Sequence, residues 1–363
     1  MLRLLAILGA TLLMSLALAQ KSPEVHTDRT VTFRLKMPNA LKVDLSLEGF
    51  DGMPMSKSND GWWSVTTKAL PADIYGYTFN VDGTTVLDPQ NHLFKPNLIW
   101  QSNMVVVPGN ELWEVQDVPH GALHRHHYKS GVIGDQRDFF VYTPPAYSTG
   151  KNLPVLYLLH GFSDTADGWT AVGKAHVILD NLIAQGKAKP MLVVMTLGYG
   201  VPDFASPGGT NFRNPELVTR NYTNFSRALL EEVEPMVEKE YKVSKAAKDR
   251  AIAGLSMGGA ESLFVGLNNL GTFGYIGAFS SGGLPGSPES AFPKFTADAA
   301  NKHLKLLWIA CGTEDGLIGM NRGLDKWLTE KRANHSYVEL PGRHTWMVWR
   351  RNLAEFASLI FKS

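Results

Sequence analysis

The sequence has little cysteine, little net charge and few long apolar runs, and each shortage excludes a class of protein. Its one cysteine, Cys311, has no partner for an intrachain disulfide, so the fold must rest on hydrophobic cores. Lys and Arg number 35 against 34 Asp and Glu and form no basic stripe, so we expect no nucleic acid as a partner. After residue 19, no stretch reaches the roughly 20 apolar residues that span a bilayer.

The first nineteen residues are typical of a secretory signal. Arg3 supplies the positive charge, residues 4–16 are almost wholly apolar, and residues 17–19 form a small-x-small cleavage site. The apolar run is shorter than a membrane span of roughly 20 residues, so a retained anchor is the less favoured alternative. We therefore expect a signal peptide over residues 1–19, a secreted or periplasmic protein, and no membrane anchor after cleavage. The remaining length suits two domains.

Residues 28–108 have the alternating pattern of β-strands. Apolar and polar residues alternate from Val31 to Leu35, from Val43 to Leu47 and from Tyr75 to Val81, and turn residues separate these runs. The spacing of the runs predicts a small all-β sandwich.

Five aromatic residues of this segment divide between its core and its surface. We expect Trp63, Tyr77 and Phe79 to pack in the core. Side chains alternate along a strand, so Trp62 points away from Trp63 and, with Trp100, is a candidate surface platform for sugars.

The segment resembles the family 48 carbohydrate-binding modules, which have an immunoglobulin-like sandwich fold. The resemblance rests on residues 31–40, 60–65, 71–83 and 88–89. It implies the sandwich, and it leaves open whether the domain binds carbohydrate or only packs against its neighbour.

Residues 109–120 are predicted to be a linker. Pro and Gly residues interrupt periodicity there, and the cluster of His124, His126 and His127 follows. No carboxylate or cysteine lies at a supporting spacing, so we expect no metal site.

From residue 121 to 363 the pattern changes to buried strands that alternate with helices. This order predicts an α/β fold with a doubly wound, mostly parallel sheet. The predicted strands are 138–142, 155–159, 191–195, 251–255, 275–279, 306–310 and 337–340, and the predicted helices are 169–187, 224–241, 260–267, 319–333 and 345–361.

A Gly-x-Ser-x-Gly motif centred on Ser256 stands between the strand 251–255 and a helix. A strained strand-to-helix turn exposes a serine hydroxyl, and Asp315 and His344 follow later strands in the order of an α/β-hydrolase. We expect Ser256 as nucleophile, His344 as its base and Asp315 as the carboxylate that orients the histidine, with Glu314 as the competing acid.

The oxyanion hole needs two backbone donors. We expect the N–H groups of Met257 and Phe162 to form it, and His160 to hold the loop that carries Phe162. These groups supply nucleophile, base and charge stabilisation themselves, so no cofactor is expected.

Residues 121–363 resemble the esterase family that includes feruloyl and acetylxylan esterases of carbohydrate esterase family 1, esterase D, enterochelin esterases and mycolyltransferases. The resemblance rests on motifs along the whole domain, namely residues 142–147, 158–161, 169, 180–182, 189–190, 254–259, 312–315, 342–346 and 349–350.

This resemblance implies a secreted serine esterase that removes feruloyl or acetyl groups from xylan or arabinoxylan. Trp169, Tyr199 and Trp346 are the substrate-side candidates. The alternatives are a siderophore-type esterase for small esters, a mycolyltransferase-like acyltransferase and, less favoured, a non-catalytic sugar-binding protein.

Overall fold

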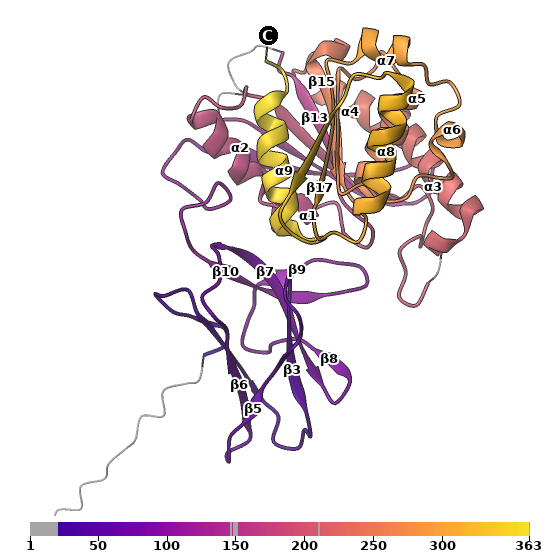
Figure 1. The fold of residues 1–363 in the computed structure, drawn as a ribbon. Coiled ribbons are helices and arrows are strands. Elements are labelled where there is room, and N and C mark those ends of the chain that lie inside the picture. Colours follow the sequence, from indigo (N-terminus) through magenta and orange to yellow (C-terminus); the bar gives the residue numbers. More distant parts are fainter. Residues whose placement is uncertain (1–20, 146, 148–151, 210, 363) are drawn as a thin grey trace, which may run out of the picture.

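A computed structural model describes residues 21–145, 147, 152–209 and 211–362. The predicted signal peptide, residues 1–19, lies outside the described residues. Figure 1 shows two parts in contact: a narrow all-β part built from the first third of the chain, and a broader part in which helices flank a sheet. The predicted fold class, an α/β-hydrolase sheet preceded by a β-sandwich, is confirmed.

The all-β part consists of two sheets in the described residues. One has the strand order β1-β2-β6-β5, and the other has the order β4-β3-β7-β10-β9 with β8 paired to β7. The strands are β1 (Glu24–Val25), β2 (Val31–Lys36), β3 (Val43–Leu47), β4 (Met53–Pro54), β5 (Ser56–Lys57), β6 (Trp62–Thr66), β7 (Asp73–Val81), β8 (Thr84–Val86), β9 (Phe94–Lys95) and β10 (Ser102–Val107).

The core of this sandwich contains the residues that alternation along the strands predicts. Trp63, Tyr77 and Phe79 are all buried, and Tyr77 packs edge-on against Phe33 with ring centroids 4.7 Å apart. Their assignment to the core is therefore confirmed.

The second part is built on a sheet of eight strands in the described residues, with the order β11-β12-β14-β13-β15-β16-β17-β18. Its strands pair in parallel from β14 to β18, while β11 and β12 are antiparallel. The strands are β11 (Ala122–Lys129), β12 (Gln136–Thr143), β13 (Val155–Leu159), β14 (Leu192–Thr196), β15 (Arg250–Leu255), β16 (Tyr275–Phe279), β17 (Leu306–Gly312) and β18 (Ser336–Leu340).

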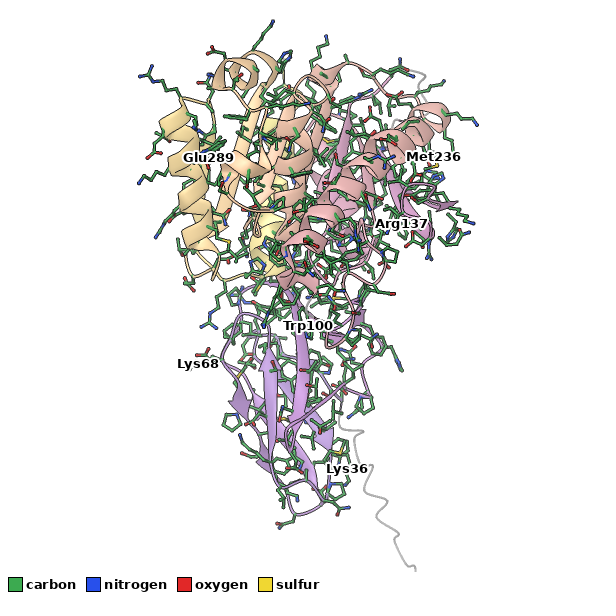
Figure 2. All side chains as sticks on the ribbon, turned by 90° about the vertical axis from the view of Figure 1, so that its right-hand side faces the viewer. Lys36, Lys68, Trp100, Arg137, Met236 and Glu289 are labelled. Atoms are coloured by element: carbon green, nitrogen blue, oxygen red, sulfur yellow. The ribbon has the colours of Figure 1, made fainter. Side chains whose placement is uncertain are left out.

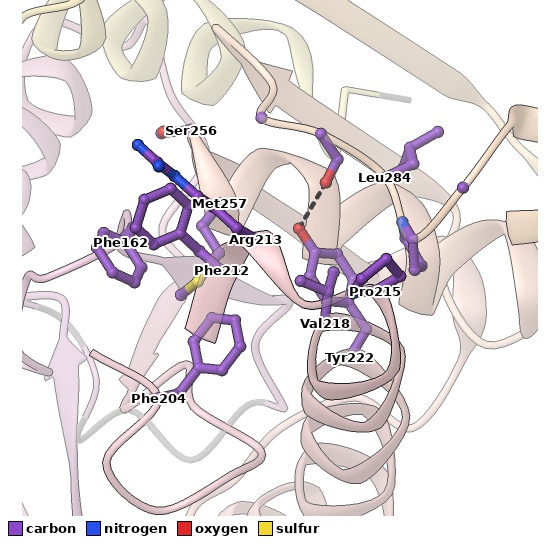
Figure 3. Close-up of a pocket in the computed structure, with 14 residues that line it drawn as sticks. Phe162, Phe204, Phe212, Arg213, Pro215, Val218, Tyr222, Ser256, Met257 and Leu284 are labelled. Atoms are coloured by element: carbon purple, nitrogen blue, oxygen red, sulfur yellow. Dashed lines mark hydrogen bonds between the residues drawn. The ribbon is translucent and has the colours of Figure 1, made fainter. Parts of the chain in front are cut away.

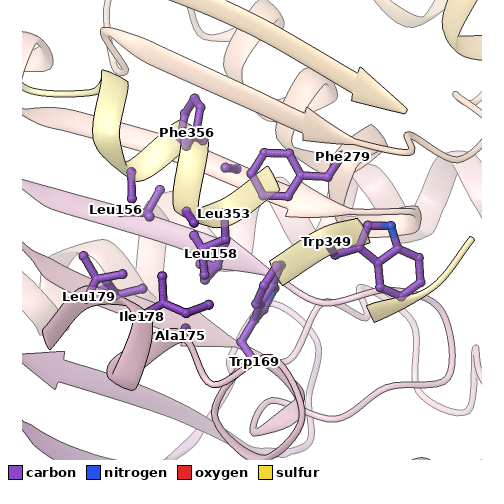
Figure 4. Close-up of a cluster of buried hydrophobic side chains, with 14 of the residues drawn as sticks. Leu156, Leu158, Trp169, Ala175, Ile178, Leu179, Phe279, Trp349, Leu353 and Phe356 are labelled. Atoms are coloured by element: carbon purple, nitrogen blue, oxygen red, sulfur yellow. The ribbon is translucent and has the colours of Figure 1, made fainter. Parts of the chain in front are cut away.

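Helices cover both faces of this sheet because its central strands are apolar on both sides. Leu156 and Leu158 of β13 pack against α2 and α9, as Figure 4 shows, while Val155 and Tyr157 pack on the opposite face. The helices are α1 (Gly168–Ala171), α2 (Ala175–Ala184), α3 (Pro215–Ala228), α4 (Glu234–Glu240), α5 (Met257–Asn268), α6 (Pro288–Ala291), α7 (Ala297–His303), α8 (Ile318–Lys331) and α9 (Trp346–Leu359), with short 3₁₀ turns at Asn211–Arg213 and Ala247–Asp249 and a π turn at Leu229–Val233.

The structure corrects two helix predictions. The helix predicted over 169–187 is broken between α1 and α2, because Lys174 adopts a left-handed backbone conformation. The helix predicted to start at residue 224 begins at Pro215, after Asn214, whose side-chain oxygen accepts from the N–H groups of residues 216 and 217.

Strand β11 was not predicted. The segment with the histidine cluster, which follows the predicted linker, forms an edge strand paired with β12 over its whole length. Most of its side chains on both faces are exposed, so it lacks the apolar alternation by which a strand is detected.

A buried ion-pair cluster joins the two parts. Asp73 of β7 accepts from Arg350 at 2.5 Å and from Arg351 at 3.0 Å, and Arg350 also donates to the carbonyl oxygens of Ile74 and Val172. Asp73 and Arg350 are both fully buried. Removing either partner would leave an uncompensated buried charge, so this cluster fixes the sandwich against α9.

We propose the domain division on this arrangement. The sandwich strands end at Val107 and the large sheet starts at Ala122, which fits a linker at 109–120 and a catalytic domain at 121–363. The sandwich extends a few residues before the predicted start at residue 28, because β1 pairs with β2.

Candidate active site

Ser256 stands on a strained turn between β15 and α5. Its backbone has φ 51° and ψ −116°, a left-handed conformation that non-glycine residues rarely adopt. The glycines on either side leave the required space: a Cβ on Gly254 would lie 2.5 Å from the backbone of Gly258, and one on Gly258 would lie 2.4 Å from the carbonyl oxygen of His160. The predicted strand, turn and helix at this motif are therefore confirmed.

The structure brings Ser256, His344 and Asp315 together at the carboxyl ends of three strands. His344 Nε2 lies 3.0 Å from Ser256 Oγ, and His344 Nδ1 lies 2.8 Å from Asp315 Oδ2. With the proton on Nδ1, which donates to Asp315, the lone pair of Nε2 can accept the serine proton. Glu314, the competing acid, is exposed and makes no contact with His344 in the described residues.

The carboxyl of Asp315 is fully buried, yet it is held ionised. Burial alone would raise its pKa, but the hydrogen bond and charge of His344, together with the N–H of Leu317 at 2.8 Å, outweigh it and hold the pKa below its ordinary value. An ionised carboxylate at this place can stabilise a positive charge on the imidazole of His344.

The loop Gly161–Asp164, here called the oxyanion loop, follows β13 directly. Asp164 N donates to Gly161 O at 3.2 Å, and Ser163 has φ 70°, so the loop turns tightly and leaves the N–H of Phe162 at its outer corner. Within the described residues, neither the N–H of Phe162 nor that of Met257 donates to a protein acceptor. Both are free to stabilise an oxyanion beside Ser256.

His160 holds this loop, as predicted. Its Nδ1 lies 2.8 Å from Gly161 O, and its Nε2 accepts from Gly198 N at 2.9 Å. Burial lowers its pKa to about 4, which keeps the ring neutral and able to accept at Nε2. Its structural role is therefore confirmed.

An apolar cavity of about 450 Å³ opens on one side of Ser256. We call it the acyl cavity, and Figure 3 shows Phe162, Phe204, Phe212, Val218 and Tyr222 around it. Tyr222 is held by a hydrogen bond of 3.0 Å to Gly283 O. Its described lining is completed by Arg213, Pro215, Met257, Gly282, Gly283, Leu284, Pro285 and Gly286, among which Arg213 is the one charged side chain.

A second hollow, of about 360 Å³, opens on the other side of Ser256. We call it the polar hollow. Lys95, Asn97 and Trp100 of the sandwich line it together with residues of the catalytic domain, namely Gly161, Phe162, Ser163, Asp164, Leu255, His344, Trp346 and Trp349. It is therefore built by both domains.

Of the three substrate-side candidates, Trp346 lines one of the two hollows beside Ser256, whereas Trp169 and Tyr199 are not in the described lining of either. Trp169 is fully buried and donates through Nε1 to Leu159 O, and buried Tyr199 donates to Asp164 O. Trp346 is buried against Trp169, with ring centroids 5.1 Å apart, and it also lines the polar hollow. Their packing roles explain why large aromatic residues occur next to the site without being accessible.

The predicted pair of surface tryptophans is separated in space. Trp62 lies beside Lys36, whose label in Figure 2 marks the end of the sandwich remote from the catalytic domain, while Trp100 lies at the junction of the domains. Trp100 is 63% exposed. The two residues therefore form no common platform.

Sequence patterns missed the residues that hold the two catalytic loops. Glu48 of the sandwich accepts from Trp346 N at 3.1 Å, just after His344, and Asn97 donates to Ser163 Oγ at 3.0 Å in the oxyanion loop. Trp349 packs against the imidazole of His344 with ring centroids 4.8 Å apart. The contacts of Glu48 and Asn97 join residues that are far apart in the sequence, so no local sequence pattern predicts them.

The histidines of β11 have separate partners. His124 contacts Thr143, His126 contacts Tyr241 and Glu240, and His127 contacts Asp138. In the part of the chain that the structure describes, no group of three or more His, Cys, Asp or Glu side chains is placed to hold a metal ion. Over the same residues, no helix is long and apolar enough to cross a membrane.

The fold and the arrangement around Ser256 define the class of protein, an α/β-hydrolase with a serine, a histidine and an acid in contact. The family described as Putative esterase matches residues 130–358. The chain belongs to this family, and it is a carboxylic ester hydrolase.

Two relatives in sequence are esterases. The endo-1,4-beta-xylanase/feruloyl esterase of Xylanibacter ruminicola is 30% identical over 94% of this chain, and the acetyl esterase of Caldicellulosiruptor saccharolyticus is 23% identical over 56% of it. The matches cover 46% and 82% of those proteins respectively. The chain thus spans less than half the length of the Xylanibacter protein.

Solved structures agree in fold. The CE1 ferulic acid esterase of Anaeromyces mucronatus in complex with ferulic acid is 26% identical, with a TM-score of 0.59 over 70% of this chain and 96% of that one. The enterobactin esterase of Shigella flexneri in the presence of enterobactin is 18% identical, with a TM-score of 0.68 over 91% of this chain and 92% of that one. The second likeness shows the fold alone.

Proposed function

We propose that this protein is a serine esterase that releases feruloyl-type aromatic acids from plant cell-wall polysaccharide such as arabinoxylan, after export from the cell. The observation that carries the proposal is the acyl cavity, which opens on Ser256 and is lined by Phe162, Phe204, Phe212 and Tyr222. Its volume, about 450 Å³, suits a substituted phenyl ring and far exceeds what an acetyl group fills. The feruloyl esterase relatives support the same acyl group.

The reaction follows from the distances around Ser256. His344 Nε2 takes the hydroxyl proton while Ser256 Oγ forms a bond to the ester carbonyl carbon, and the N–H groups of Phe162 and Met257 stabilise the oxyanion. The tetrahedral intermediate collapses as the bond to the alcohol oxygen breaks, and His344 gives that oxygen its proton. Water then attacks the acyl carbon while His344 takes its proton, the bond between that carbon and Ser256 Oγ breaks, and His344 returns the proton to Oγ as the free acid leaves.

The test measures hydrolysis of methyl ferulate and of an acetylated xylan in parallel, with Ser256→Ala as control. We expect turnover of methyl ferulate and little turnover of the acetyl ester. Turnover of the acetylated xylan alone would overturn the aromatic acyl group, because it requires a small acyl pocket. A catecholate ester of the siderophore type serves as a third substrate, and exclusive turnover of that ester would overturn the cell-wall substrate.

A further inference from the structure

The polar hollow lies where the alcohol part of a bound ester must go. When the aromatic acid occupies the acyl cavity, the rest of the ester extends from the carbonyl carbon on the other side of Ser256. His344, which must protonate the leaving alcohol oxygen, lines the polar hollow and is absent from the described lining of the acyl cavity. The polar hollow is therefore the side from which the alcohol departs.

Trp100 is held in place at the edge of this hollow. Asn97 Oδ1 accepts from the N–H groups of Ile99 at 2.9 Å and of Trp100 at 2.7 Å, which fixes the loop between β9 and β10. The indole ring lies 6.1 Å from the ring of Phe162, and it remains 63% exposed. A rigid, exposed aromatic face beside a catalytic serine is suited to stack on a flat apolar face of a ligand.

Lys95 and Asp164 add a hydrogen-bond donor and an acceptor to the lining of the same hollow. Lys95 Nζ makes no hydrogen bond or ion pair with any described residue. Asp164 is 95% buried, and its Oδ1 accepts from Asn97 Nδ2 at 3.1 Å, while no donor among the described residues reaches its Oδ2. An ammonium, a carboxylate oxygen and an aromatic face together match the hydroxyls and the C–H face of a sugar ring.

The hollow continues along the sandwich. A groove of about 520 Å³ shares Lys95, Trp100 and His344 with it and runs over the sandwich past Thr78, Gln101 and other polar residues, namely Ser46, Glu48, Thr85 and Ser102. This groove gives room for further sugar units beyond the one that carries the ester.

We propose that the sandwich completes the active site as its alcohol subsite, in which Trp100, Lys95 and Asp164 hold the sugar residue esterified by the aromatic acid. This inference rests on the proposed function. The sandwich then helps to select the alcohol part of the ester directly beside the bond that is cleaved. An independent sugar-binding surface elsewhere on the domain is not required.

The experiment compares two esters with the same acid: methyl ferulate and a feruloyl ester of an arabinose-containing oligosaccharide. For Trp100→Ala we expect kcat/KM on the sugar ester to fall about 10- to 100-fold, because a stacked aromatic contact and its buried area are lost. The loss on methyl ferulate should be at least about fivefold smaller. Lys95→Met, which breaks no hydrogen bond or ion pair among the described residues, should lower kcat/KM on the sugar ester about 3- to 10-fold.

Trp62→Ala is the matched control, since it removes a tryptophan from the same domain far from Ser256. Equal losses on both esters for Trp100→Ala and Lys95→Met would overturn the inference, as would no loss for either. A loss on the sugar ester in Trp62→Ala alone would show a separate binding module and also overturn it. Absence of wild-type activity on methyl ferulate is a different result, since it would contradict the proposed function.

Discussion

The two hollows beside Ser256 differ in which part of the chain builds them. The acyl cavity is lined by residues 162–286, all from the catalytic domain, and it is almost wholly apolar. The polar hollow combines Lys95, Asn97 and Trp100 of the sandwich with the loops that carry Phe162 and His344. One domain can thus select the acid, while the alcohol meets both domains. Changes to each side should therefore affect different parts of the substrate.

In the proposed mechanism Ser256, His344 and Asp315 act on every ester, so loss of this centre should have the largest effect. Asp315→Asn should lower kcat/KM about 10⁴-fold on methyl ferulate and on the sugar ester alike, because it disturbs the histidine tautomer and removes the buried charge. Steady-state kinetics on both esters measure the effect. Glu314→Gln is the matched control one residue away, and a comparable loss in that variant would show that the acid was assigned wrongly.

A substitution confined to the acyl cavity should lower the hydrolysis of esters of a large acid more than that of esters of a small acid. Val218→Trp places a large ring into the cavity from α3 and should lower kcat/KM on methyl ferulate on the order of 100-fold. Hydrolysis of 4-nitrophenyl acetate should change less than about threefold, since an acetyl group does not reach Val218.

Thr219→Trp adds the same bulk at the next, exposed position of α3 and is the control. If Val218→Trp reduced hydrolysis of the acetate and the ferulate equally, the cavity would not be the acyl site.

The stability of the folded protein should depend on pH through Asp164, which lines the polar hollow. Burial raises the pKa of Asp164 to about 6, with Lys95 and Glu48 as the charged groups nearby and His344 in the same hollow. The folded protein therefore binds this proton more tightly than the unfolded chain. The resulting stability is present in full below the unfolded pKa, about 3.9, and is lost as the pH rises through about 6.

Asp164→Asn removes this proton-binding site and keeps an oxygen that can accept from Asn97. Between about pH 4 and pH 7, the free energy of unfolding of the wild type should fall by about 1 to 3 kcal/mol relative to the variant. Urea unfolding at several pH values measures it. Parallel pH profiles of the two proteins would contradict the buried, proton-binding state of Asp164.

The smallest expected effect concerns the contact by which the sandwich holds the histidine loop. Glu48→Gln leaves one side-chain oxygen for two donors, the N–H groups of Gly76 and of Trp346, so the contact two residues after His344 weakens and kcat should fall about tenfold on both esters. Asp51→Asn is the control, because the ion pair of Asp51 with Arg343 is exposed and should contribute little. Unchanged kcat in Glu48→Gln would show that the sandwich binds the alcohol without positioning His344.

The three residues proposed for catalysis could be predicted from the sequence better than the residues that line the two hollows. Ser256, Asp315 and His344 each follow a strand of a parallel sheet, and the carboxyl ends of such strands meet at one edge, so local patterns place them together. The positions of Lys95, Asn97 and Trp100 depend on how two domains dock. The docking rests on Asp73 and Arg350, which are distant in sequence.

The residues that line the acyl cavity could not be predicted from sequence patterns either. Phe204, Phe212 and Arg213 lie in a stretch rich in Gly, Pro, Ser and Asn, where no periodicity indicates which side chains converge. The aromatic residues that the sequence made conspicuous, Trp169 and Trp346, proved to be buried supports of the loops around Ser256.

Methyl ferulate and the sugar ester should give the same acyl-enzyme on Ser256, although their alcohols differ. Rapid quenching during turnover of methyl ferulate and of the sugar ester, followed by peptide mass spectrometry, tests it directly. We predict one feruloyl group on the peptide containing Ser256 from either ester, with the same rate of hydrolysis afterwards and slower formation from the sugar ester in Trp100→Ala. A feruloyl group on another residue, or rates of hydrolysis that differ with the departed alcohol, would contradict a common acyl-enzyme on Ser256.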